Sequence, residues 1–142
     1  METFTKVEIA SIQLQRALVL FCAKDYISAL TLAGAAEEIL GKIVEAKGEA
    51  NALTEDVCYI ETRLRGKADS MTSKQIASFL NQPRNQLKHF GDVSASLVSL
   101  NPSADAESLI ERATLNYLRA CGKWPDFDDA YERYNNARNE QN

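Results

Sequence analysis

Residues 23–42, AKDYISALTLAGAAEEILGK, decide the fold class of this chain. Apolar residues recur at helical spacing after Asp25, whose carboxylate is suited to accept hydrogen bonds from the free backbone N–H groups that begin a helix. The interior holds Gly34 among alanines, although glycine costs a helix about 1 kcal/mol relative to alanine. We therefore predict a central helix over about 26–47, with another helix packed closely at Gly34 and with Leu40 in the core.

The same spacing of apolar residues runs through most of the remaining chain. A first helix is predicted by one apolar stripe, formed by Val7, Ala10, Leu14, Ala17, Leu18 and Phe21. Further helices are predicted over about 54–65 with Thr54 as cap, from Ser73 to Gly91, from Ser103 to about Cys121, and over the amphipathic stretch 128–140. No segment alternates with the period of a strand. The prediction is an all-α, single-domain bundle of four to five main helices over residues 1–125, followed by a C-terminal amphipathic helix and polar tail over 126–142.

Pro83 falls inside the predicted helix that starts at Ser73. A proline in a helix interior removes one backbone hydrogen bond and clashes with the preceding turn. We therefore expect this helix either to kink at Pro83 or to restart after Asn81.

The composition excludes several classes of protein. No run of about 18 apolar residues is present and the N-terminus lacks the pattern of a signal peptide, so we expect a cytoplasmic protein with no membrane contact. Cys22, Cys58 and Cys121 form no CxxC pair, which favours buried thiols over a zinc site or disulfides. No metal-binding or cofactor-binding motif is found, and we expect neither a metal nor a cofactor.

Charge is distributed unevenly along the chain, whose net charge is −4. Residues 1–61 hold ten acids and five bases, and residues 92–142 hold nine acids and five bases. Residues 62–91 hold one acid and six bases, namely Arg63, Arg65, Lys67, Lys74, Arg84 and Lys88. This basic island predicts a surface that holds RNA or an acidic partner.

The island contains NQPRNQLKHF, residues 81–90, with the only histidine of the chain. Arg84 offers a fixed fork of donors for phosphate oxygens, and His89 has a side chain that exchanges a proton near neutral pH. Together they suit metal-free RNA cleavage, with Asn85 orienting them and Lys88 attracting phosphate. The alternative is that His89 only caps the negative end of its helix and that Arg84 is a solvated charge.

Glu37 and Glu38 form another pair of adjacent charges, on the predicted central helix. Two carboxylates in a helical bundle suggest a metal site when each is followed by a histidine three residues on, but neither has that partner. We therefore predict that both are solvated charges on the surface of the central helix.

The segment RNQLKH resembles the Arg-x4-His motif of HEPN domains, including the polar residue directly after the arginine. AKDYISALTLAGAAEEILGK resembles the long second helix of that family, and DAESLIERATLNYL resembles the helix after its motif helix. The resemblance covers roughly residues 8–120. It implies an all-α bundle that dimerises and places two motifs in one cleft, with Arg84 and His89 catalytic and Asn85 orienting them.

The resemblance leads to two hypotheses on function, and a third stands without it. The first is a metal-independent ribonuclease with a composite site in a homodimer, as in toxin–antitoxin or phage-defence systems, where an antitoxin or other protein partner is expected. The second is a non-catalytic HEPN-like module that binds RNA or a protein partner through Lys88, Lys74, Arg63, Arg65 and Lys67. The third is a purely structural helical protein.

Overall fold

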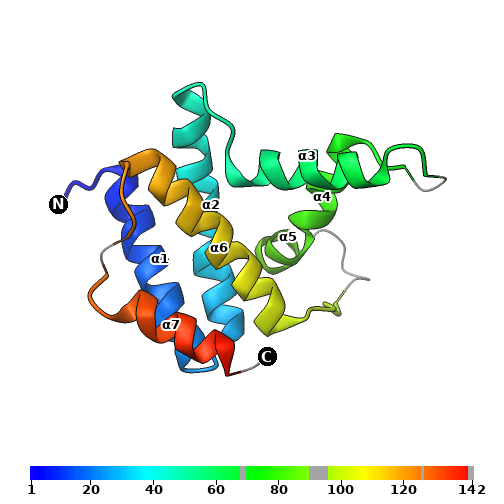
Figure 1. The fold of residues 1–142 in the computed structure, drawn as a ribbon. Coiled ribbons are helices and arrows are strands. Elements are labelled where there is room, and N and C mark those ends of the chain that lie inside the picture. Colours follow the sequence, from blue (N-terminus) through cyan, green and yellow to red (C-terminus); the bar gives the residue numbers. More distant parts are fainter. Residues whose placement is uncertain (68–69, 90–95, 126, 141–142) are drawn as a thin grey trace.

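The structure is a computed structural model that describes residues 1–67, 70–89, 96–125 and 127–140. Within these ranges it consists of seven helices joined by loops, without a strand, so the all-α prediction is confirmed (Figure 1). The helices are α1 (Lys6–Cys22), α2 (Tyr26–Ala46), α3 (Ala52–Leu64), α4 (Ser73–Leu80), α5 (Gln82–Lys88), α6 (Pro102–Cys121) and α7 (Ala130–Asn139). The count exceeds the predicted four to five main helices because the helix expected from Ser73 is divided in two and the C-terminal stretch forms α7.

Helices α1, α2 and α6 form the body of the bundle, and their apolar stripes meet in one core (Figure 1). Leu40 is fully buried, as predicted. In the stripe of α1 five of the six predicted residues are buried, while Val7 is half-buried at the first turn. The 3.6-residue period of the apolar residues therefore identified the inner faces of these helices correctly.

Helix α7 packs against α1 (Figure 1). It adds aromatic side chains to the same core. The Tyr134 ring is buried and lies edge-on to the ring of Phe21, with 5.0 Å between the centroids. Edge-to-face contacts of this kind stabilise by about 0.5–1.5 kcal/mol beyond the area buried. Phe127, Ala130 and Tyr134 thus contribute to the core that the preceding helices build.

Side-chain caps explain where two of the helices begin. Asp25 caps α2, accepting a hydrogen bond from the Ser28 backbone N–H at 3.2 Å, as predicted. The prediction that Thr54 caps α3 is wrong, because the Asn51 side chain accepts the hydrogen bond of the Thr54 backbone N–H at 2.9 Å. Helix α3 therefore begins two residues earlier, at Ala52.

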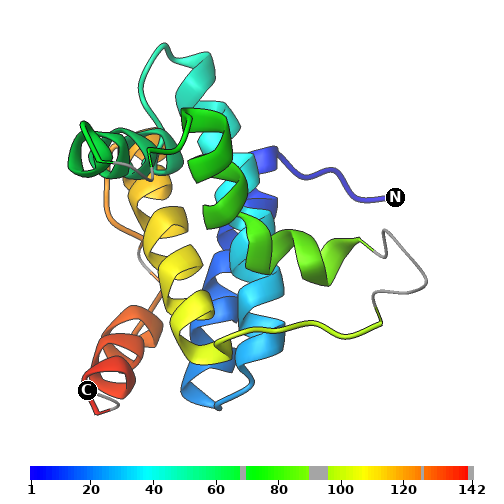
Figure 2. The same ribbon diagram turned by 90° about the vertical axis from the view of Figure 1, so that its right-hand side faces the viewer.

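The chain turns sharply between α4 and α5, so that the two helices point in different directions (Figure 2). Asn81 joins them, and Pro83 lies in the first turn of α5, where its missing N–H needs no partner. The predicted restart after Asn81 is confirmed. Helix α5 ends at Lys88 with His89 as C-cap, and the end predicted at Gly91 lies outside the described residues.

Helices α3 and α4 pack side by side, and α3 extends sideways from the bundle (Figure 1). Only Ala52 and Val57 of α3, and Ile76 of α4, are buried. Most side chains of this α3–α4 hairpin are therefore available to a partner.

The three cysteines are free, and none is fully buried. Cys22 and Cys121 are half-buried, whereas Cys58 is exposed on α3, so the prediction of buried thiols is wrong for Cys58. Within the described ranges, no helix combines the length and the apolar character needed to cross a membrane.

Candidate functional site

Arg84 lies in the first half of α5 and turns its side chain into the bundle. Its Nη1 atom donates a hydrogen bond to Glu37 Oε2 at 3.0 Å and lies 3.7 Å from Glu38 Oε2. The side chain is 12% exposed. A guanidinium held by carboxylates in this way is less available to a phosphate than a solvated one, since the phosphate would have to compete with Glu37.

The aliphatic part of Arg84 explains the glycine in the middle of α2. A Cβ atom at Gly34 would lie 2.7 Å from Arg84 Cγ and 3.2 Å from Leu109 Cδ1. Both distances are shorter than ordinary contacts, so Gly34 makes room for a side chain of α5 and one of α6. The close approach predicted at Gly34 is confirmed, and Arg84 is its nearest neighbour.

Glu37 is buried, with 3% of its surface exposed, and the prediction of a solvated charge is wrong for this residue. Its Oε1 atom accepts a hydrogen bond from Arg112 Nη2 at 2.6 Å, while its Oε2 atom accepts that of Arg84. Glu37 is thus held between arginines from α5 and α6. Two charge-assisted hydrogen bonds offset the cost of removing the carboxylate from water.

Glu38 is partly exposed, in agreement with the prediction of a surface charge. Its carboxylate accepts a hydrogen bond from Lys88 Nζ at 2.8 Å. This hydrogen bond lowers the pKa of Glu38, with a smaller contribution from the charge of Arg84. Lys88, expected to attract phosphate, is therefore partnered by an acid within its own chain.

Arg112 is a member of this cluster that the sequence did not reveal. It is 3% exposed and donates from Nη2 to Asn81 Oδ1 at 2.8 Å, in addition to its bond with Glu37. It therefore ties α6 both to α2 and to the junction of α4 and α5. Arg112 lies three residues after Leu109, so it places a charge on the apolar stripe of α6. That charge among apolar positions was the sequence feature that could have indicated a buried arginine.

His89 lies at the opposite end of α5 and is exposed. Its backbone is extended, and its N–H donates to the Asn85 carbonyl at 3.1 Å. Asn85 is exposed as well. No hydrogen bond joins Arg84 to His89 in the part of the chain that the structure describes. One chain therefore turns Arg84 inward and leaves His89 at the surface.

The four remaining basic residues gather elsewhere, at the end of the hairpin where α3 ends and α4 begins. We call this surface the α3–α4 tip; it consists of Tyr59, Arg63, Arg65, Lys67 and Lys74, all of them exposed. A hydrogen bond between the Ser73 hydroxyl and Glu61 fixes the start of α4 beside α3. The Arg63 guanidinium lies over the Tyr59 ring, 5.2 Å from its centroid.

The tip and the Arg84–His89 segment are different surfaces, because the hairpin extends away from α5 (Figure 1). Charge pairing differs between them as well. Arg84 and Lys88 are partnered by Glu37 and Glu38, whereas no ion pair involves the four cations of the tip within the described ranges.

Among the described residues, no group of three or more histidine, cysteine, aspartate or glutamate side chains is arranged to hold a metal ion. Comparison of the chain with protein-family models, with curated proteins and with solved structures found no match. The resemblance to HEPN domains stays a prediction from the sequence.

Proposed function

We propose that this protein is a HEPN-like module that binds single-stranded RNA on the α3–α4 tip. The observation that carries the proposal is a group of four exposed cations, paired with no acid in the described part of the chain, next to an exposed aromatic ring. Cations attract the phosphate backbone and release its counterions. An aromatic ring stacks on a base of any sequence, a contact worth about 1–3 kcal/mol.

Tyr59 and Arg63 are well arranged for this purpose. The guanidinium over the ring keeps the Tyr59 side chain in place and adds a second planar surface for stacking. Arg65, Lys67 and Lys74 add exposed positive charge just after α3 and at the start of α4. The net charge of −4 then confines RNA to this surface, because acids predominate in the rest of the sequence.

The test is binding of a fluorescent single-stranded RNA at several salt concentrations. The double variant Arg65→Ala/Lys67→Ala should bind more weakly, and the slope of log affinity against log salt should fall by about 0.7 for each phosphate that the variant no longer neutralises. The matched control is Lys24→Ala/Lys123→Ala, which removes the same charge from exposed positions outside the tip. Equal binding by the tip variant and the wild type would refute the proposal.

A second function, metal-independent RNA cleavage, is favoured by the exposure of His89 beside Asn85 at the end of α5. An exposed imidazole is accessible to a substrate and suits a general acid–base. Because Arg84 of the same chain is engaged with Glu37, this function requires a homodimer and a rearrangement of Arg84 toward phosphate. A toxin-like role with an antitoxin partner belongs to this second proposal.

The variant His89→Ala distinguishes a ribonuclease from a protein that only binds RNA. If the protein is a ribonuclease, this variant and Arg84→Ala should reduce cleavage by about 10²–10⁴-fold, with chelator having no effect on the wild type. His89→Ala should leave RNA binding unchanged, since His89 lies outside the tip. Sedimentation that shows only a 15.8 kDa species would argue against the composite site.

A further inference from the structure

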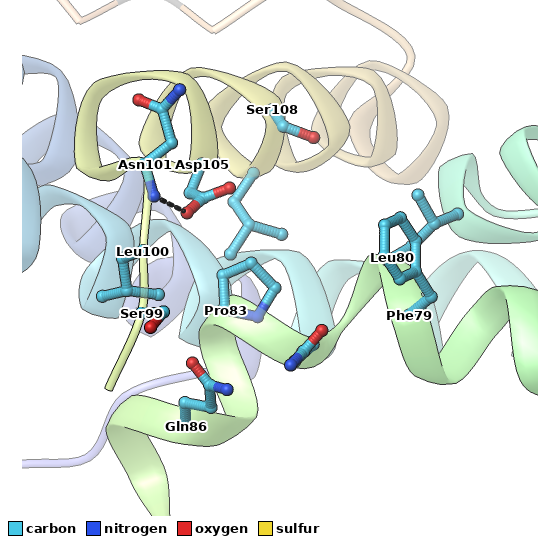
Figure 3. Close-up of a pocket in the computed structure, with 11 residues that line it drawn as sticks. Phe79, Leu80, Pro83, Gln86, Ser99, Leu100, Asn101, Asp105 and Ser108 are labelled. Atoms are coloured by element: carbon cyan, nitrogen blue, oxygen red, sulfur yellow. Dashed lines mark hydrogen bonds between the residues drawn. The ribbon is translucent and has the colours of Figure 1, made fainter. Parts of the chain in front are cut away.

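A pocket of about 280 Å³ lies in the corner between α4 and α5, where the chain segment that leads into α6 closes it (Figure 3). Its walls come from three parts of the chain: the end of α4, the start of α5 and the first turns of α6 with the residues before them. The volume is just below the range of about 300–1,000 Å³ that is usual for drug-sized ligands. It has room for one small ligand.

The pocket is lined by apolar and by polar residues. The apolar part of the lining consists of Leu80, Pro83, Leu100 and Leu109, together with Phe79. Phe79 stands at the edge with 65% of its surface exposed, which is unusual for a phenylalanine. An exposed ring beside an apolar pocket is suited to stack on a flat ligand.

The polar groups of the pocket favour a neutral ligand that donates hydrogen bonds. Asp105 is the only charged side chain among the described residues of the lining, so an anion would be repelled. One of its carboxylate oxygens accepts the Asn101 backbone N–H at 2.8 Å, and the other is not used in that bond (Figure 3). Gln86 Oε1 is buried and has no hydrogen-bond partner among the described residues. Burial of an acceptor without a donor is unfavourable, and a turn of the Gln86 side chain toward a ligand with N–H groups would relieve it.

We propose that this pocket binds one unpaired guanine base. Guanine presents two adjacent donors, N1–H and the N2 amino group, on one edge; Asp105 would accept one of them, and Gln86 Oε1 would accept the other after its side chain turns toward the ligand. Its flat rings would lie against the apolar part of the lining and stack on Phe79. Recognition of single-stranded RNA depends on such contacts to splayed-out bases.

The inference rests on the proposed RNA binding and adds base selectivity to it. Lys74 and Phe79 are five residues apart on α4, a rise of about 7.5 Å along the helix axis. The two side chains are also rotated by about 140° about the axis, so a strand whose phosphates lie against Lys74 at the tip would follow α4 partly round its axis to bring a neighbouring base to Phe79. The tip would supply charge, and the pocket would supply selectivity.

The test uses nucleosides, which lack phosphate and so do not depend on the tip. Guanosine, inosine and adenosine are titrated into the isotope-labelled full chain, and the side-chain amide signals of Gln86 are followed by NMR. Guanosine should bind best, and inosine, which lacks the N2 amino group, should bind at least about fivefold more weakly. Guanosine binding that is no tighter than inosine or adenosine binding would overturn the proposal.

Two variants localise the site. Phe79→Ala removes an exposed ring without touching the core, and Asp105→Asn keeps an oxygen for the Asn101 N–H while removing the charge. Each should weaken guanosine binding at least about fivefold. Trp124→Ala is the matched control, because Trp124 is 54% exposed and is not in the pocket lining. Unchanged binding by Phe79→Ala would refute the site even if Asp105→Asn proved unstable.

Measurements of RNA binding distinguish failure of the pocket proposal from failure of the tip proposal. If both proposals hold, Phe79→Ala abolishes the preference for oligonucleotides with guanine and leaves the salt dependence unchanged. If only the tip binds RNA, oligonucleotides with and without guanine bind equally to the wild type, which overturns the pocket alone. If only the pocket is real, guanosine binds while Arg65→Ala/Lys67→Ala leaves RNA binding unaltered, which overturns the tip alone.

Discussion

Arg84 Nη1 lies 3.0 Å from Glu37 Oε2, in a place where the arginine side chain is 12% and the glutamate side chain 4% exposed. Arg112 completes the cluster at 2.6 Å from the other carboxylate oxygen. One acid of α2 thus holds α5 and α6 together. The arginine of the predicted catalytic motif is, in the single chain, part of the structure that stabilises the fold.

Glu37→Gln should lower the free energy of unfolding by about 3–5 kcal/mol, because it leaves two poorly solvated guanidinium groups without their counter-charge. Urea denaturation measures the change. The control is Glu38→Gln next to it, whose partly exposed pair with Lys88 should contribute less than about 1 kcal/mol. Equal effects of the two substitutions would show that the buried cluster does not stabilise the protein.

Gly34→Ala should destabilise the wild type more than it destabilises an Arg84→Ala variant. In the wild type the new Cβ would lie 2.7 Å from Arg84 Cγ and displace the side chain. Without Arg84 that clash is absent, and the higher helix propensity of alanine, up to about 1 kcal/mol, offsets part of the cost of the remaining 3.2 Å contact with Leu109 Cδ1. A double-mutant cycle by chemical denaturation tests the coupling, and additive effects would contradict the close approach.

Leu40→Ala should cost about 2–5 kcal/mol of stability because it leaves a cavity in the fully buried core. Leu97→Ala serves as control, since Leu97 is 92% exposed and its truncation should change the free energy of unfolding by no more than about 0.5 kcal/mol. Thermal and urea unfolding of both variants give the comparison. A loss below that of the control would mean that α2 presents a different face to the core.

Asp56 should make stability depend on pH. Burial raises the pKa of Asp56, and the charge of Arg112 opposes the shift only in part. A carboxyl whose pKa is higher in the folded state favours folding while protonated, and this contribution is lost as pH rises through the folded pKa. Asp56→Asn should therefore be more stable than the wild type at pH 7, and the difference should vanish below about pH 3.9, the ordinary aspartate pKa. Urea denaturation from about pH 3 to 7 measures it; a constant difference would contradict the assignment.

The local sequence determined the helices. The apolar period of α1 and α2, the cap at Asp25 and the interruption before Pro83 all depend on residues within a few positions of each other, and the structure agrees with each. The close approach at Gly34 was also predicted from the sequence, because the energetic cost of glycine inside a helix indicates that close packing offsets it.

Tertiary structure decided which charges are buried. Glu37 meets Arg84 and Arg112, which are 47 and 75 positions away in the chain. A helical period shows which face a residue occupies, but it does not show whether opposite charges from other helices reach that face. Without such partners a buried carboxylate is too costly, and with two of them it becomes part of the interior. The roles of Glu37, Arg84 and Arg112 therefore emerged only when α2, α5 and α6 were packed together.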